Sequence, residues 1–271
     1  MTGRSGSVFG DLMKAKLKET GSEDTIMDAM KSMKTGFREV RSALTGHEYH
    51  KKMKIAVFGA TGPTGQQVVI QALAKEGTEV RALVRDPDKM TSLVEPHEKL
   101  HIHKVDLTKP EEFATHLHGV DVVLSCLGGR AGIFNPCSVY TDTIVPIVTA
   151  MRQANVKRLI CITSWGAKDE PGLPWVISWF LKPTFLRNVL ANMGEMEDYL
   201  AEKCSDINYT VVKPPGLSKD PVSEKEILTR EGQFVENAAN SIARADLARF
   251  MIACLDTEDF NHKLVAVGVP K

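Results

Sequence analysis

The chain has 271 residues with 34 basic and 34 acidic side chains, so its formal net charge at neutral pH is zero. This balance argues against a general nucleic-acid binder, whose basic face shifts the total charge. Hydrophobic residues make up 43% of the chain, which excludes a disordered protein and is sufficient for a substantial core.

The five cysteines form no Cys-x-x-Cys pair, which is typical of a reducing compartment and argues against a disulfide framework and a zinc site. No stretch approaches the roughly 20 apolar residues that cross a bilayer. The N-terminus lacks the apolar core and small-residue cleavage site of a secretory signal. An organelle transit peptide is an alternative, although the segment contains acidic residues, which such peptides avoid. We therefore expect a soluble cytoplasmic protein without a metal site.

The N-terminal region differs in composition from the rest, because it is rich in Lys, Glu, Ser and Met and has no recognisable strand. We expect a helical extension over residues 1–52 and one domain over residues 53–271. Apolar residues three or four positions apart predict an amphipathic helix over residues 26–44: Ile26, Met30, Met33, Phe37, Val40 and Leu44. This helix either packs on its own domain or binds a protein partner, since Met-rich stripes adapt to varied surfaces.

The second region alternates between short apolar runs and helical patterns. Strands are predicted over residues 54–58, 79–84, 100–105, 121–124, 158–162, 209–212 and 264–267. Helices are predicted over residues 65–75, 111–117, 140–153, 186–203 and 245–255. The strand runs are continuously apolar, which fits strands buried on both faces. Their order predicts an α/β doubly wound parallel sheet, in which ligands bind outside the carboxyl ends of the strands.

A glycine-rich loop, Gly59-Ala-Thr-Gly62-Pro-Thr-Gly65, follows the first predicted strand. Gly59 permits a sharp turn, Gly62 lets the backbone approach a pyrophosphate, and Gly65 allows close packing of the next helix. The free N–H groups at the start of that helix then face the phosphates. The order of strand, loop and helix predicts a Rossmann-type dinucleotide site, which includes Thr61 and Thr64.

The end of the second predicted strand indicates which dinucleotide is bound. NAD sites place Asp or Glu there to bond the ribose 2′-hydroxyl. This chain has Arg85, whose guanidinium fits a 2′-phosphate, so we expect NADP. The alternatives are that Asp86 binds the ribose, or that Arg85 is a solvated charge at the end of a strand.

Further cofactor contacts are expected after the third and fourth strands. Asp106 and Leu107 lie where the adenine edge is expected. Leu127 and Gly128 follow the fourth strand, next to the expected ribose and nicotinamide. Arg130 either holds a phosphate or an acidic substrate, or has only a surface role.

These motifs together resemble the atypical short-chain dehydrogenase/reductase superfamily. The resemblance covers residues 53–271 and points to its flavin and biliverdin reductase branch, although NmrA-like relatives share most of the motifs. It is carried by residues 54–65, Val84-Arg-Asp86, Thr163-Ser164, Tyr209-Thr-Val-Val-Lys-Pro-Pro215 and the closing helix over residues 242–256.

The predicted reaction centre lies after the fifth strand. Ser164 would project toward the nicotinamide, where a hydroxyl can donate a hydrogen bond to a substrate carbonyl or ring nitrogen. The resemblance implies the same catalytic role, and the alternative is a serine that only caps a turn. Pro214, after the sixth strand, is included in the predicted cofactor site.

Other residues limit how far the resemblance extends. Tyr199-x-x-x-Lys203 matches the Tyr/Lys pair of short-chain dehydrogenases, but it lies so late in its helix that we interpret it as coincidence. Where the flavin and biliverdin reductases carry pocket histidines, this chain has Met193 and Gly216, which leaves the substrate open.

The sequence thus favours an NADPH-dependent reductase that passes a hydride to a planar conjugated acceptor, such as a flavin, tetrapyrrole or quinone. Four aromatic residues could form an apolar wall for that acceptor, or cover the sheet edge instead: Trp175, Trp179, Phe180 and Phe185. A rival hypothesis is an NmrA-like regulator that binds NADP(H) as a redox signal for a partner protein. A third is a scaffold that binds its partner through residues 26–44.

Overall fold

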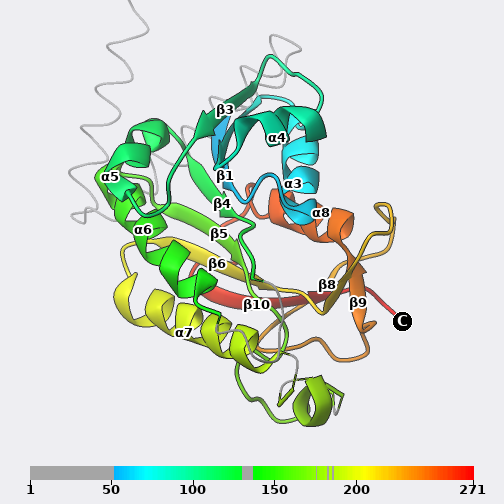
Figure 1. The fold of residues 1–271 in the computed structure, drawn as a ribbon. Helices are drawn as coiled ribbons and strands as arrows, with labels where there is room; N and C mark the ends of the chain where they lie inside the picture. Colours follow the sequence, from blue (N-terminus) through cyan, green and yellow to red (C-terminus); the bar gives the residue numbers. More distant parts are fainter. Residues whose placement is uncertain (1–51, 130–136, 175, 182, 185) are drawn as a thin grey trace, which may run out of the picture. The chain divides into compact units, whose positions relative to one another are not determined.

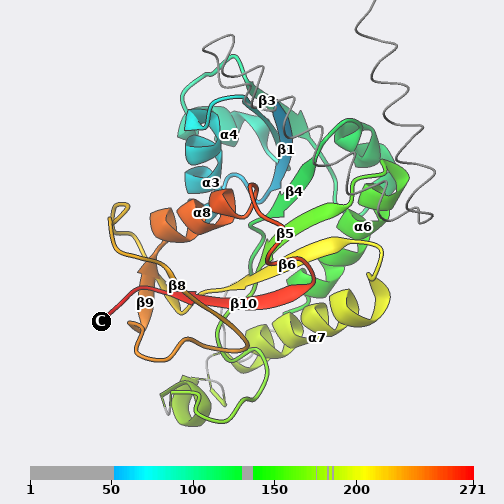
Figure 2. The same cartoon turned by 180° about the vertical axis from the view of Figure 1, so that it is seen from behind.

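The computed structural model describes residues 52–129, 137–174, 176–181, 183–184 and 186–271. These residues form a sheet with helices on both faces, which Figures 1 and 2 show from opposite sides. The predicted helix over residues 26–44 lies outside the described residues, as do Arg130, Trp175 and Phe185.

The main sheet has eight strands in the order β3-β2-β1-β4-β5-β6-β10-β8. The strands are β1 (Met53–Phe58), β2 (Thr78–Val84), β3 (Leu100–Lys104), β4 (Val122–Ser125), β5 (Arg158–Ile162), β6 (Asn208–Lys213), β8 (Leu228–Glu231) and β10 (Lys263–Gly268). All neighbours pair in parallel except β8 and β10. The predicted doubly wound sheet is therefore confirmed. The strand order reverses between β1 and β4, where ligands bind in such sheets.

Two helical layers cover the sheet (Figure 1). One layer contains α3 (Pro63–Ala74), α4 (Pro87–Leu93) and α8 (Arg244–Ala253). The other contains α5 (Pro110–Phe113), α6 (Val139–Gln153) and α7 (Arg187–Lys203). Among the described residues, no helix combines the length and apolar character needed to cross a membrane. The cytoplasmic location stays a prediction.

Strand β1 shows why the apolar runs become central strands. Ile55 and Val57 pack toward the layer of α3 and α8, whereas Ala56 and Phe58 pack toward the layer of α6 and α7. All four side chains are fully buried. A strand that is covered on both faces needs apolar residues at every position, so it shows no alternation.

Three segments differ from the predictions. Strand β8 is an antiparallel edge strand; its sequence Leu-Thr-Arg-Glu is mostly exposed, so no hydrophobic run marks it. The helix predicted over residues 111–117 is divided into α5 and a 3₁₀ turn, η1 (Ala114–Leu117). The segment between β5 and α7, for which no helix was predicted, contains one helical turn, η2 (Val176–Leu181).

A small second sheet lies next to the carboxyl end of β6. Strand β7 (Gly216–Ser218) pairs in parallel with β9 (Ser241–Ala243), and α8 begins directly after β9. This pairing brings Arg244, the first residue of α8, beside the segment that follows β6. Two parts of the chain that are remote in sequence thus meet at the ligand-binding edge of the main sheet.

Candidate functional site

The glycine loop between β1 and α3 has a conformation and packing that only glycine allows at two positions. Gly59 has φ of +72°, and a Cβ atom there would lie 2.7 Å from the backbone carbonyl of Cys126. A Cβ atom on Gly65 would lie 2.2 Å from the carbonyl oxygen of Gly59. The loop is closed by a 2.9 Å hydrogen bond from the N–H of Gly62 to that same oxygen. These glycines therefore let β1, the end of β4 and α3 approach each other closely.

The N-terminus of α3 is open toward a ligand. Gly62 is its N-cap, no side chain caps it, and Pro63 occupies the first turn. The first intrahelical bond is donated by Gln66 to the Gly62 carbonyl, so the N–H groups of Thr64 and Gly65 precede the helical ladder. Free amides at the positive end of a helix fit an anionic group such as a pyrophosphate.

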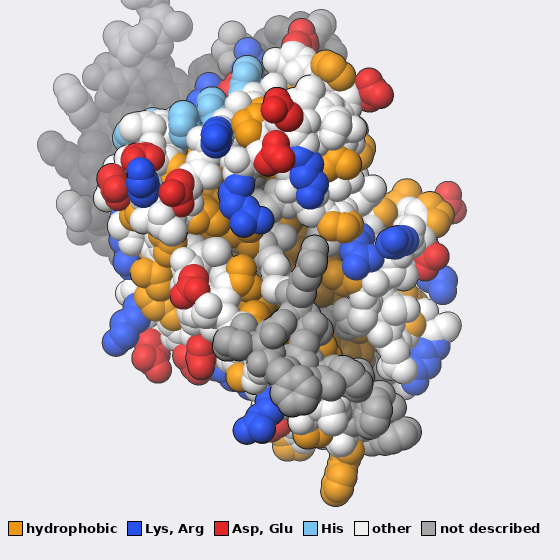
Figure 3. Space-filling view, in the orientation of Figure 1, with side chains coloured by type: hydrophobic (Ala, Val, Ile, Leu, Met, Phe, Trp, Pro, Cys, Tyr) orange, Lys and Arg blue, Asp and Glu red, His pale blue; other side chains and the backbone are white. Residues whose placement is uncertain are grey.

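A cavity of about 540 Å³ opens at the carboxyl ends of the central strands. Its lining joins the glycine loop to seven other parts of the chain: residues 126–129, Tyr140, residues 162–164, Leu186, Met193, residues 214–217 and Arg244. In Figure 3, hydrophobic side chains are visible in the depression at the centre of the face, with charged side chains of both signs around it. A planar apolar molecule can therefore lie beside a group that is held at the glycine loop.

The structure brings most of the predicted site residues into this cavity. The cavity lining includes the following predicted residues: Gly59, Thr61, Gly62, Thr64, Leu127, Gly128, Ser164 and Pro214. Ser164 Oγ donates a 3.3 Å hydrogen bond to the carbonyl oxygen of Pro214, which ties the ends of β5 and β6 together. Met193 and Gly216, the two positions without the expected histidines, also line the cavity.

The residues predicted for the adenosine end lie outside this lining. Arg85 is exposed directly after β2, and the neighbouring Asp86 caps α4, accepting a 3.1 Å hydrogen bond from the N–H of Lys89. Asp106 follows β3 and accepts bonds from the Thr108 backbone and hydroxyl, which lower the pKa of its carboxyl group. Leu107 packs partly buried against the core. These roles stay predictions.

Tyr140 is a site residue that the sequence interpretation missed, because it considered this residue only as the start of a helix. Tyr140 lies in the first turn of α6, only 6% exposed. Its phenol oxygen accepts a 3.3 Å hydrogen bond from the N–H of Gly129, and its own N–H donates to Asn192 Oδ1 on α7 at 2.9 Å. Burial raises the pKa of its phenol to about 12. The sequence signal that could have identified Tyr140 is a hydroxyl-bearing residue in the first turn of the helix that follows the fourth strand.

Arg244 is the second residue that was missed. It lines the cavity partly buried, and its Nη1 donates to the carbonyl oxygens of Leu217 at 3.2 Å and Ser218 at 2.9 Å. These bonds to the end of the short sheet fix the direction of the guanidinium. No carboxylate among the described residues forms an ion pair with it. Arg244 therefore brings to the cavity wall a positive charge that no described carboxylate pairs with.

A buried ion pair supports the cavity from below. Lys213, at the end of β6, forms a short ion pair with Glu197 on α7, and both side chains are fully buried. Thr163, next to Ser164, donates a 2.7 Å hydrogen bond to the same oxygen of Glu197. Burial lowers the pKa of Lys213. The polar network fixes β5, β6 and α7 relative to one another directly beneath the site.

The aromatic wall that was predicted for the acceptor is not formed by Trp179. This side chain is 83% exposed on η2 and does not line the cavity. The side chain of Phe180 lies outside the described residues, like Trp175 and Phe185. The apolar surface of the cavity instead comes from shorter side chains, among them Leu186 and Met193 on the α7 side. Trp179 lies on a helical turn that leaves its side chain exposed, so residue type alone did not indicate its direction.

Tyr199 lies away from the cavity. It is partly buried near Cys204 and Arg152, at the C-terminal end of α7, and burial raises the pKa of its phenol. Met193, in the first half of the same helix, contacts the cavity instead. No group of three His, Cys, Asp or Glu side chains among the described residues could hold a metal ion.

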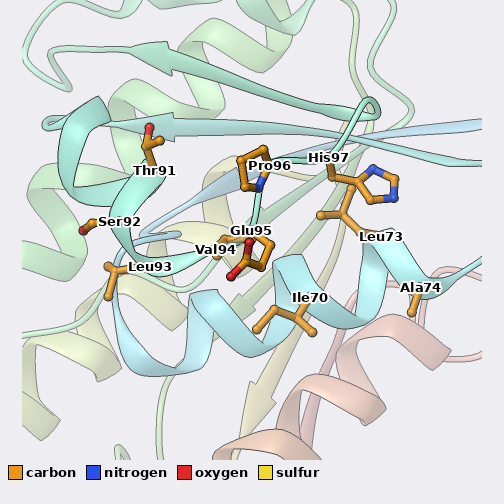
Figure 4. A pocket seen from close by; sticks show the side chains of 10 residues that line it. All are labelled: Ile70, Leu73, Ala74, Thr91, Ser92, Leu93, Val94, Glu95, Pro96 and His97. Atoms are coloured by element: carbon orange, nitrogen blue, oxygen red, sulfur yellow. The ribbon is translucent and has the colours of Figure 1, made fainter.

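A second groove, of about 520 Å³, lies between α3 and the segment that joins α4 to β3 (Figure 4). Ile70 and Leu73 of α3 face Val94 and Pro96 across it, and Glu95 and His97 are its ionisable groups. This groove lies where α3 and α4 end and the chain returns to the amino ends of the strands. Since ligands of doubly wound sheets bind at the opposite ends, we place the chemistry in the first cavity.

Comparison with protein families gives one match, described as NAD(P)H-binding, over residues 59–258. An uncharacterized chloroplastic protein of Arabidopsis thaliana is 30% identical, over 80% of this chain and 77% of its own length. The oxidoreductase tpcG of Aspergillus fumigatus is 24% identical, over 80% of this chain and 83% of its own length. The photosystem II assembly factor Ycf39 of Guillardia theta is 27% identical, and the match covers 75% of this chain and 60% of that protein.

Solved structures share the same fold. A short-chain dehydrogenase/reductase of Veillonella parvula, in complex with NADP, superposes with a TM-score of 0.65 at 20% identity. The match covers 80% of this chain and 95% of that structure. At this identity the likeness shows the fold alone.

Proposed function

Because the chain belongs to the NAD(P)H-binding family of Rossmann-fold proteins, related to the atypical short-chain dehydrogenases/reductases, we propose that it is an NADPH-dependent reductase of a planar conjugated acceptor. A flavin, a tetrapyrrole or a quinone fits this description. The observation that carries the proposal is that the open N-terminus of α3 and the Ser164 hydroxyl line the same cavity.

The glycine loop holds the pyrophosphate of the cofactor through Gly59, Thr61, Gly62 and Gly65. The open first turn of α3 supplies the amides, and no side chain of the described residues competes for them as a cap. Leu127, Gly128 and Pro214 lie beside the nicotinamide half.

Arg85 binds the 2′-phosphate of NADP in this proposal, and Asp106 and Leu107 flank the adenine. Support for Arg85 comes from its exposed position directly after β2, and from Asp86, whose carboxylate caps α4. A guanidinium there favours NADPH over NADH, since it forms charge-assisted bonds to a phosphate.

The acceptor occupies the space between Ser164, Met193 and the segment after β6. The bound cofactor supplies a hydride, and the protein positions the acceptor and excludes water from it. Ser164 lies at the end of β5 with its oxygen fixed by the Pro214 carbonyl, so it orients a polar edge of the acceptor. Leu186 and Met193 present an apolar face to the ring system.

Arg244 further limits the class of acceptor that fits the cavity. Its guanidinium is directed by two backbone carbonyls and has no ion-pair partner among the described residues. A fixed positive charge in a partly apolar cavity favours acceptors with an acidic group. The phosphate of FMN and the propionates of a tetrapyrrole are such groups, and an uncharged quinone lacks them.

The test is NADPH oxidation by the purified protein with FMN, riboflavin, biliverdin and a quinone offered separately. We expect turnover with a flavin or tetrapyrrole, and a lower rate in Ser164→Ala. Riboflavin serves as the matched control for FMN, because it lacks the phosphate that Arg244 would bind. NADPH binding without oxidation of any acceptor would contradict the proposal.

A second candidate function is a sensor that binds NADP(H) and passes the signal to a partner protein without turnover. Two observations favour it: Met193 and Gly216 line the cavity where the flavin and biliverdin reductases carry pocket histidines, and one relative is a photosystem II assembly factor. The partner would bind residues 26–44. Deleting residues 1–52 should then abolish the association with the partner and leave the cofactor affinity unchanged.

A further inference from the structure

Five hydroxyl-bearing residues line the cavity, and the three that lie outside the glycine loop, Tyr140, Thr163 and Ser164, differ in where their protons are directed. Thr163 donates to Glu197 at 2.7 Å, and Ser164 donates to the Pro214 carbonyl at 3.3 Å. The phenol of Tyr140 is different, because its oxygen accepts the N–H of Gly129 at 3.3 Å. None of the described residues accepts the phenolic proton. A hydroxyl group carries one proton and two lone pairs, so Tyr140 still has a proton to donate.

The surroundings of Tyr140 hold its phenol against the cavity. The residue is 6% exposed, and its backbone N–H is bound to Asn192 of α7. The phenol oxygen lies beside Gly128 and Gly129, where a Cβ atom on Gly128 would come within 3.6 Å of it. Both glycines line the cavity together with Ser164. The ring is therefore held beside these two glycines, and the phenol, whose proton no described residue accepts, lies against the space that a ligand would fill.

We propose that Tyr140 is the hydrogen-bond donor to the acceptor molecule, and that Ser164 presents its oxygen to a donor group of that molecule. This inference rests on the proposed reductase function and assigns to Tyr140 the donor role that the sequence alone suggested for Ser164. The two residues lie on different elements, α6 and the end of β5, so they can contact different atoms of one ring system.

The chemistry of the phenol fits a donor that keeps its proton. Burial raises the pKa of the phenol to about 12, so the group keeps its proton at neutral pH. Such a phenol polarises a carbonyl oxygen or ring nitrogen as negative charge develops there, and the bond strengthens as the charge grows. The acceptor class is therefore a conjugated molecule with a carbonyl or imine-type atom at the edge that faces α6.

The experiment compares two acceptors with different edges. Menadione has carbonyl oxygens and no hydrogen-bond donor, whereas FMN has carbonyl oxygens and one ring N–H. Three variants are compared with the wild type: Tyr140→Phe, Ser164→Ala and, as the matched control, Tyr199→Phe. The readouts are NADPH oxidation with each acceptor and the equilibrium affinity for FMN in the presence of NADP⁺, measured by quenching of flavin fluorescence, with menadione as competitor.

We expect Tyr140→Phe to lower the reduction rate and the affinity by about three- to tenfold with both acceptors, the size of one neutral hydrogen bond. Ser164→Ala should affect FMN and leave menadione nearly unchanged. Tyr199→Phe should keep the wild-type reduction rates and acceptor affinities. All three variants should bind NADPH with the wild-type affinity.

Loss of menadione reduction in Ser164→Ala alone, or a Tyr140→Phe variant equal to the wild type, would overturn the inference. An inactive wild type would contradict the reductase function, and the FMN and menadione affinities would then still test Tyr140. Absence of binding of either compound to the wild type would overturn both.

Discussion

The two halves of the cavity differ in whether backbone or side-chain atoms form them. The cofactor half is mainly backbone: the loop from Gly59 to Gly65, the open turn of α3 and the carbonyl of Cys126 in tight contact with Gly59. The acceptor half is made of side chains from separate elements, with Tyr140 on α6 and Met193 on α7. A buried ion pair beneath holds those elements in place.

This difference has a physical consequence for each half. A phosphate cradle made of amides depends little on side-chain identity, because backbone N–H groups supply its contacts. A surface of side chains can change one residue at a time, and with it the molecule that fits. Substrate specificity should therefore lie in the acceptor half, and cofactor affinity in the loop.

The largest effect should come from breaking the support of the acceptor half. Lys213→Met leaves Glu197 charged and fully buried without its partner, which typically costs about 3–5 kcal/mol of unfolding free energy. Denaturant unfolding of the purified variant measures it. The double variant Lys213→Met with Glu197→Leu should recover much of the loss, because an apolar pair can replace a buried ion pair. A single variant as stable as the wild type would show that the network does not hold the acceptor half.

Adding a single methyl group to the glycine loop should lower both the stability of the protein and its affinity for NADPH. Gly59→Ala places a Cβ atom 2.7 Å from the Cys126 carbonyl, so we expect a loss of about 3 kcal/mol in stability and more than about tenfold in NADPH affinity. Gly119→Ala is the matched control: its φ of +73° is almost the same as that of Gly59, but nothing lies within 4 Å of the added atom. That variant should lose only about 1 kcal/mol and bind NADPH normally. Equal effects in the two variants would mean that close packing at Gly59 is unimportant.

Arg85 extends the cofactor half to the 2′-phosphate. Arg85→Ala should weaken NADPH binding by about tenfold and leave NADH binding unchanged, since only NADPH carries the phosphate. Isothermal titration with both cofactors measures the difference. Parallel loss for NADPH and NADH would place the 2′-phosphate elsewhere.

The smallest effect is expected outside both halves. Arg152 forms two bonds with Asp206, of 2.7 and 3.0 Å, and holds the pKa of that carboxyl near 2. Because the pKa is lower in the folded state, the pair stabilises the protein above about pH 4 and loses this contribution as the pH falls toward 2. The pair is solvent-exposed, so Asp206→Asn should cost less than about 1 kcal/mol at neutral pH. Thermal unfolding should show the difference from wild type shrinking between about pH 4 and pH 2, without any change in cofactor binding.

The strand, glycine loop and helix of the cofactor half could be predicted from the sequence because their determinants are contiguous. Three glycines within seven residues, between an apolar run and a helical pattern, allow the sharp turn and the close approach of the backbone to a phosphate. The helix that follows directs the positive end of its dipole to the same place. The central strands were equally visible, since strands such as β1 are buried on both faces and must be apolar throughout. These features depend on local geometry, which sequence spacing encodes directly.

The acceptor half could not be predicted to the same degree, because contacts between remote elements create it. Tyr140 becomes a site residue only when α6 brings its phenol against Gly129, and Arg244 only when β7 pairs with β9. Trp179 shows the opposite case, an aromatic residue whose type suggested the cavity but whose side chain is exposed to solvent. Direction and long-range pairing are not contained in residue type or spacing.

The measurement that most directly tests whether both halves work as one site is a single turnover of NADPH with FMN under anaerobic conditions, with deuterium at one or the other C4 position of the nicotinamide. We predict that NADPH is consumed in step with FMN reduction, and that the label slows the reaction at one of the two positions only. This outcome requires one fixed face of the cofactor to meet the acceptor in the cavity. Binding of NADPH without any reduction of FMN, or equal slowing by both labels, would contradict the proposed site.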